Sequence, residues 1–119
     1  MDQDKIRRLE EAKIDIHELY ERMCNKEELV LKFLNKFLED ENFLELQKSY
    51  VKKDPEVMLR YAHTLKGISA NLNMFALNQA CSAMVKHIRE QELSLLDKDY
   101  QDICQEYQVV VSALKDVLK

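Results

Sequence analysis

Apolar residues recur every three or four positions through most of the chain, which is the spacing of helices that bury one face. A helix is expected from about Leu96 to Leu118, with its apolar face formed by Tyr100, Ile103, Cys104, Tyr107, Val110, Val111, Leu114 and Leu118. Another is expected from about Phe75 to Glu90, with Leu77, Ala80, Cys81, Met84 and Ile88 at the same spacing. Long amphipathic helices with short connections predict an antiparallel helical bundle.

Shorter helical segments are expected in the N-terminal part of the chain. Residues 1–13 form a polar helical arm, and a short helix follows from about Ile16 to Met23. Asn25 with Glu28 three positions later has the pattern of a capping box, so we expect Asn25 to cap a longer helix. The polar EDEN sequence at 39–42 is expected to break that helix, which continues to about Lys53. The aromatic residues expected in the core are Phe33, Phe37, Phe43 and Tyr61.

The sequence Asp54-Pro55-Glu56 marks the clearest helix start. Asp is a good N-cap, Pro fits the first helical position, and Glu complements the N-terminal dipole. The helix should run to Asn71 or Leu72, and Asn73 is expected to end it in the left-handed conformation.

The composition fits one all-α domain. The chain has 119 residues, 46% of them apolar and 34% charged, and only one Gly and one Pro, which leaves little material for β-turns. We therefore predict an antiparallel four-helix bundle with additional short N-terminal helices, divided into an arm at 1–13 and one bundle domain at 14–119.

Charge and cysteine usage exclude several classes of function. A net charge of −4 argues against nucleic acid as the main partner. No secretory signal and no long apolar run is visible, so we expect a cytoplasmic protein without membrane contact. We also expect the protein to be a monomer. Cys24, Cys81 and Cys104 lack metal-site spacing and are expected to be reduced thiols that serve mainly as small core residues. No metal site is predicted.

A helical wheel of residues 55–73 places His63 opposite the core. The core face consists of Met58, Tyr61, Ala62, Leu65, Ile68, Ser69 and Leu72. His63 shares the outer face with Glu56, Leu59, Arg60, Lys66, Gly67 and Ala70. Gly67 is the only glycine and lies one helical turn after His63, where it costs about 1 kcal/mol relative to Ala. We infer that Gly67 and Ala70 leave room for another protein beside the imidazole.

These residue types suit phosphoryl transfer. A neutral imidazole is a good nucleophile toward phosphorus, and histidine is largely neutral near pH 7. Lys66, one turn away, can neutralise phosphoryl oxygens. The sequence contains no Gly-rich nucleotide loop, no carboxylate spaced as a triad partner, and no Glu-x-x-His pair. His17 and His87 have no such neighbours and are expected to be ordinary surface or boundary residues.

The sequence AHTLKGISANL at 62–72 resembles the signature of histidine-containing phosphotransfer (HPt) domains. The resemblance extends to the sequence directly before it, FLNKFLEDENFLELQKSYVKKDPEVMLRY, and to the spacing of Leu77 and Cys81 after it. It covers roughly residues 14–118. It implies a helical bundle that relays a phosphoryl group between aspartates of receiver domains. Asn73 stands where the family usually has Gly, and Val85 stands where many members have Glu or Gln.

By this resemblance His63 is the phosphorylated residue, Lys66 supports the phosphoryl group, and the chain is a phosphocarrier rather than an enzyme. The expected partners are response-regulator receiver domains and a hybrid histidine kinase, with Mg²⁺ supplied by the receiver and no cofactor on this chain. The residues expected to contact a receiver are Leu59, Arg60, Gly67, Ala70 and Val85. Two alternatives stay open: a receiver-docking scaffold that is not phosphorylated, and a phosphoacceptor domain excised from a larger histidine kinase.

Overall fold

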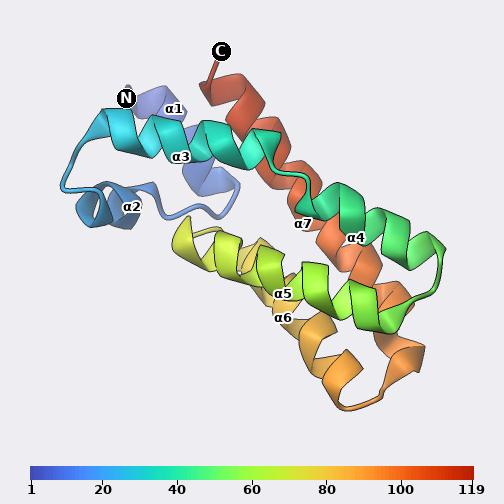
Figure 1. The fold of residues 1–119 in the computed structure, drawn as a ribbon. Coiled ribbons are helices and arrows are strands. Elements are labelled where there is room, and N and C mark those ends of the chain that lie inside the picture. Colours follow the sequence, from blue (N-terminus) through green and yellow to red (C-terminus); the bar gives the residue numbers. More distant parts are fainter.

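The computed structural model describes all residues from 1 to 119 and contains helices joined by short connections (Figure 1). The elements are α1 (Gln3–Glu11), α2 (Ile16–Arg22), α3 (Glu27–Glu39), α4 (Asn42–Val51), α5 (Pro55–Asn71), α6 (Phe75–Arg89), the 3-10 helix η1 (Leu93–Leu95) and α7 (Leu96–Val117). The predicted all-α class and helical bundle are confirmed.

The molecule is elongated, with extents of 44 × 23 × 21 Å. At one end α4, α5 and α6 pack in sequence, and α6 packs on α7 (Figure 1). At the other end α1 and α3 pack on the C-terminal part of α7 (Figure 1). The long helix α7 therefore belongs to both ends. No helix of the chain combines the length and apolar character needed to cross a membrane.

The start of α5 follows the sequence prediction. The backbone N–H of Val57 donates to Oδ1 of Asp54 at 3.3 Å, and Pro55 occupies the first turn. Proline suits that position because its missing N–H would have no partner inside the helix. The predicted break at 39–42 is also confirmed, since α3 ends at Glu39 and α4 begins at Asn42.

The end of α5 is fixed by Asn73, which has φ 55° as predicted. The backbone N–H of Met74 donates to the carbonyl of Ser69 at 2.8 Å, which closes the helix end. Asn73 is buried, and its Nδ2 donates to the carbonyl of Asp15 at 3.2 Å, while its own carbonyl accepts from the Asp15 N–H at 3.0 Å. Asn73 thus joins the connection between α1 and α2 to the end of α5, a link that Gly would make only in part.

The predicted capping box at Asn25 is wrong. Asn25 and Cys24 both have positive φ, and the Asn25 N–H donates to the carbonyl of Tyr20 at 2.7 Å, so Asn25 closes α2 instead of opening α3. Helix α3 begins at Glu27 without a side-chain cap. Cys24 is exposed, which contradicts a core role for this thiol.

The core is one continuous apolar cluster that runs through the whole molecule. Two stacked aromatic pairs connect α4 to α7: Phe43 with Tyr107 at 3.9 Å, and Tyr50 with Tyr100 at 3.7 Å between ring centroids. The arm α1 buries Leu9 in this core, although the domain boundary placed at residue 13 stays a prediction. Phe33, predicted in the core, is instead 36% exposed.

Candidate functional site

His63 lies in the middle of α5, and its side chain is exposed. The imidazole makes no hydrogen bond or ion pair within the chain, in contrast to His17 and His87, which both have carboxylate partners. Both of its nitrogens are therefore available to a second molecule.

The space beside His63 is open. Gly67 is exposed, and a Cβ built on it would meet no atom within 4 Å. Its φ is not positive, so neither backbone conformation nor internal packing requires a glycine here. The effect of Gly67 that remains is the absence of a side chain one turn from the imidazole, which leaves the surface there uncrowded. Lys66 lies on the same turn and is half-buried.

Side-chain hydrogen bonds hold this part of α5 in place. Ser69 Oγ donates to the carbonyls of Leu65 at 2.7 Å and Lys66 at 3.0 Å. From α6, Asn78 Nδ2 donates to the same Lys66 carbonyl at 2.8 Å. Asn78 was not predicted as a site residue from the sequence. The one local hint was its position directly after Leu77, an apolar residue predicted to face the core. Asn78 ties the turn that bears Lys66 to the neighbouring helix.

The predicted docking residues separate into three groups. Arg60 and Ala70 are exposed on the outer face of α5, as is Gly67. Leu59 is half-buried and packs against the core. Val85 is 2% exposed and belongs to the core, so its expected role as an exposed docking residue is wrong. An apolar residue at this position of α6 faces the interior because burial removes its side chain from water.

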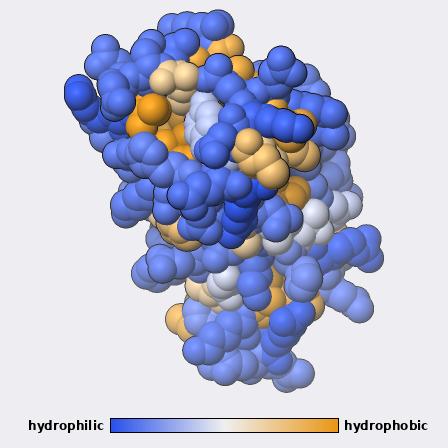
Figure 2. Space-filling view, turned by 90° about the vertical axis from the view of Figure 1, so that its left-hand side faces the viewer, coloured by the Kyte–Doolittle hydropathy of each residue, from blue (hydrophilic) through white to orange (hydrophobic).

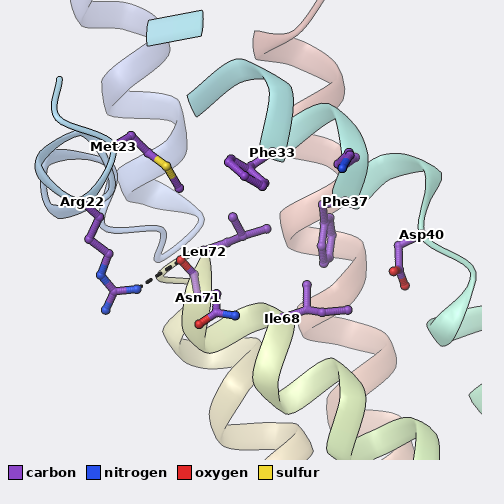
Figure 3. A pocket seen from close by; sticks show the side chains of 9 residues that line it. Arg22, Met23, Phe33, Phe37, Asp40, Ile68, Asn71 and Leu72 are labelled. Atoms are coloured by element: carbon purple, nitrogen blue, oxygen red, sulfur yellow. Dashed lines mark hydrogen bonds between the residues drawn. The ribbon is translucent and has the colours of Figure 1, made fainter. Parts of the chain in front are cut away.

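A pocket of about 450 Å³ opens beside the C-terminal part of α5 (Figure 3). Its lining residues come from α2, α3, α5 and their flanks: Arg22, Met23, Phe33, Lys36, Phe37, Asp40, Ile68, Asn71 and Leu72. Figure 3 shows Phe33, Phe37, Ile68 and Leu72 pointing into the space between α3 and α5. The pocket thus combines an apolar floor with charged side chains around it.

Arg22 connects the pocket to the end of α5. Its guanidinium donates to the carbonyls of Ala70 at 3.3 Å and Asn71 at 3.1 Å in the last turn of the helix, and Figure 3 shows the bond to Asn71. Lys36 lies 5.9 Å from the centre of the Phe33 ring. Figure 2 shows one side of the molecule as largely hydrophilic, with hydrophobic atoms confined to patches.

The other two histidines have structural contacts. Nε2 of His17 lies 3.0 Å from a Glu10 carboxylate oxygen, on the surface as expected. Nδ1 of His87 lies 2.7 Å from Oδ2 of Asp99, and Asp99 is buried. No group of three or more His, Cys, Asp or Glu side chains is arranged to hold a metal ion.

The fold and site define a helical bundle that presents one unpaired histidine on the outer face of a central helix. The family model of the Hpt domain matches residues 28–117, most of the chain. The chain therefore belongs to the Hpt domain family, whose members serve histidine phosphotransfer in phosphorelays with receiver domains and histidine kinases. Comparison with curated proteins and with solved structures gives no match.

Proposed function

We propose that this chain is a phosphorelay intermediary in which His63 accepts a phosphoryl group from the aspartate of one receiver domain and passes it to the aspartate of another. The observation that carries the proposal is the exposed, unbonded His63 imidazole beside the open surface at Gly67. The donor would be the receiver of a hybrid histidine kinase, the acceptor that of a response regulator, and the relay would operate in the cytoplasm.

The reaction requires little chemistry from the carrier. A lone pair of the neutral imidazole attacks phosphorus, the N–P bond forms as the P–O bond of the aspartyl phosphate breaks, and the aspartate leaves as a carboxylate. The reverse sequence loads the second receiver. Catalysis of phosphoryl transfer consists mainly of positioning and charge neutralisation. Lys66 supplies one positive charge, and Mg²⁺ belongs to the receiver, so His63 is substrate and carrier.

The receiver would dock over α5 and the pocket described above. Arg60, Gly67 and Ala70 are exposed on the face of α5 that bears His63, and Leu59 on the same face is half-buried. The pocket with Phe33 adds exposed apolar surface, and Lys36 adds a positive charge at its rim, where Asp40 also lies; Arg22 is paired with Glu18 at 3.3 Å. This combination suits a receiver surface that is mainly apolar. Transfer needs rapid exchange of partners, so we expect an interface at the small end of the size range.

The test is incubation of the chain with a receiver domain carrying labelled aspartyl phosphate. We expect label on the chain that is lost in acid and retained in base, and no label on His63→Gln. His17→Gln is the matched control because His17 is also exposed on a helix, and it should be labelled as the wild type is.

Other results have distinct meanings. A wild-type chain that binds the receiver without acquiring label would support the docking-scaffold alternative. Label that persists on His63→Gln would place the phosphoacceptor elsewhere. A panel of receivers, each tested as donor and as acceptor, would identify the cognate pair and the direction of transfer.

A further inference from the structure

A second groove is lined by residues at the end of the bundle where the α4–α5 and α6–α7 connections lie; Figure 1 shows the course of these two connections. It has a volume of about 420 Å³. The lining residues are Tyr50, Val51, Lys53, Pro55, Met58, Leu93, Leu96 and Asp97. Of these, only Pro55 and Met58 belong to α5, and Met58 faces the core, so the groove shares no residue with the outer face that carries His63.

Large apolar side chains are exposed at this groove. Val51 is 78% exposed, the highest value among the large apolar residues of the chain, and Leu93 is 49% exposed. Leu95, on the same 3-10 helix as Leu93, is exposed as well. Neighbouring exposed apolar residues around a depression are typical of an interaction surface.

The two walls of the groove are held together rigidly. The Tyr50 hydroxyl on α4 donates to Oδ1 of Asp97 on α7 at 2.6 Å, and the Tyr50 ring stacks on that of Tyr100. The Lys53 N–H donates to the Tyr50 carbonyl at 2.9 Å, which fixes the turn after α4. The groove is therefore formed before any partner arrives, which lowers the entropic cost of binding.

The charges of the two walls are opposite. Lys53 lies on the α4 side and Asp97 on the α7 side, both are exposed, and neither has an ion-pair partner within the chain. A surface with one positive and one negative wall is complementary to itself after a two-fold rotation. In that arrangement Lys53 of each copy faces Asp97 of the other, and Val51 of each copy enters the opposite groove.

We propose that this groove is the contact surface between two copies of the chain in a two-fold symmetric dimer. The proposal replaces the monomer expected from the sequence and does not depend on the function of His63. The groove includes no residue of the outer face of α5, so we expect such a dimer to leave both His63 side chains free. With a groove of this size we expect a weak interface at the low end of the known range.

The test uses sedimentation equilibrium of the full chain over concentrations up to about 1 mM, where a contact worth about 4 kcal/mol is half-formed. We expect the wild type to dimerise reversibly. Val51→Asp should raise the dimer dissociation constant at least tenfold, by placing a charge in the opposite groove. Leu44→Asp is the control: Leu44 is also exposed on α4 but does not line the groove, and its variant should dimerise as the wild type does.

Charge reversal tests the symmetry. Lys53→Glu alone creates like-charge contacts on both sides of the two-fold axis, and Asp97→Lys alone does the same with the opposite sign, so each variant should be monomeric. An equimolar mixture of the two should form a heterodimer, because a groove with two negative walls then faces a groove with two positive walls. Far-UV circular dichroism checks folding; if Asp97→Lys does not fold without its Tyr50 contact, Val51→Asp and Lys53→Glu still decide the question.

Three results would overturn the proposal. The first is a wild type that stays monomeric at about 1 mM. The second is a dimer that Val51→Asp and Lys53→Glu leave intact, which would place the contact on another surface. The third is a mixture of folded charge variants that remains monomeric. Loss of receiver binding in Val51→Asp, with a monomeric wild type, would assign the groove to a receiver instead.

Discussion

Nδ1 of His87 on α6 lies 2.7 Å from Oδ2 of Asp99 on α7, and the Asp99 carboxylate makes no other side-chain hydrogen bond. Because Asp99 is buried, removal of the imidazole would leave a buried carboxylate without a partner. Breaking such a pair is costly, although His87 itself is only partly buried. We expect His87→Ala to lower the free energy of unfolding by about 2 kcal/mol, measured by urea denaturation.

His17→Ala is the control for this prediction, since its ion pair with Glu10 is on the surface and such pairs contribute little. The double variant with Asp99→Ala should lose less than the sum of the single losses. Additive losses would mean that the contact contributes no specific stability.

Gly67→Gln should separate stability from transfer. Replacing Gly in a helix interior by a better helix former stabilises by up to about 1 kcal/mol, and the added side chain has open space. The same side chain would occupy the approach to His63. We expect the free energy of unfolding to rise while the rate of transfer from a receiver falls at least tenfold. Gly67→Ala should be equally stable and transfer nearly normally; unimpaired transfer in Gly67→Gln would refute the role of clearance.

Phe33→Asp tests whether the pocket next to α5 contacts the receiver. Phe33 is partly exposed at the pocket, so the substitution should weaken receiver binding about tenfold, measured by calorimetry, with little effect on folding. Val109→Asp is the control, because Val109 has nearly the same exposure, 37%, but does not line the pocket. Equal binding by the two variants would show that the receiver does not contact Phe33.

Asn73→Ala should be more destabilising than Asn73→Gly. Both variants lose the hydrogen bond to the Asp15 carbonyl, but only Ala also bears the cost of the left-handed backbone at φ 55°. That cost is about 1–2 kcal/mol. Urea denaturation should show a difference of this size between the two variants. If Ala and Gly are equally stable at this position, the left-handed conformation is not what selects Asn73.

Alkaline pH should destabilise the fold in part through Cys81. Burial raises the pKa of the Cys81 thiol from 9.0 to about 12. Above about pH 9 the unfolded chain therefore binds fewer protons than the folded chain, and the free energy of unfolding falls by up to about 1.4 kcal/mol per pH unit. Cys81→Ala should reduce this slope between about pH 9 and 10. An unchanged slope in Cys81→Ala would exclude this contribution.

Much of the fold could be predicted from periodicity and helix signals. The apolar spacing located α6 and α7, and Asp54-Pro55 located the start of α5 because cap chemistry is local. The prediction at Asn25 was wrong because Asn suits two positions: the N-cap that begins a helix and the left-handed turn that ends one. The residue type alone does not distinguish these positions, since the difference depends on the backbone of the preceding turn. The error at Phe33 arose because a helix period cannot show where the neighbouring helices leave a gap.

The candidate site was predictable to a similar degree. The wheel placed His63 and Gly67 on the outer face of α5, since both lie on one regular helix. The wheel could not place Val85, which is on α6, because its environment depends on how two helices pack. The contacts of Asn78 with the Lys66 carbonyl and of His87 with Asp99 were not predicted for the same reason. Each contact joins residues of different helices, so no local sequence pattern indicates it.

The packing of α1 on α7 also affects the order in which the chain folds. The ion pair between Arg8 and Asp116 joins residues 108 positions apart, at 3.0 Å. During synthesis α1 leaves the ribosome long before α7 exists, so Leu9 has no complete site in which to be buried. Helices α4 to α6 contact their neighbours in sequence and can assemble earlier. Helix α1 is thus made before α7 but reaches its final position only after α7 is available.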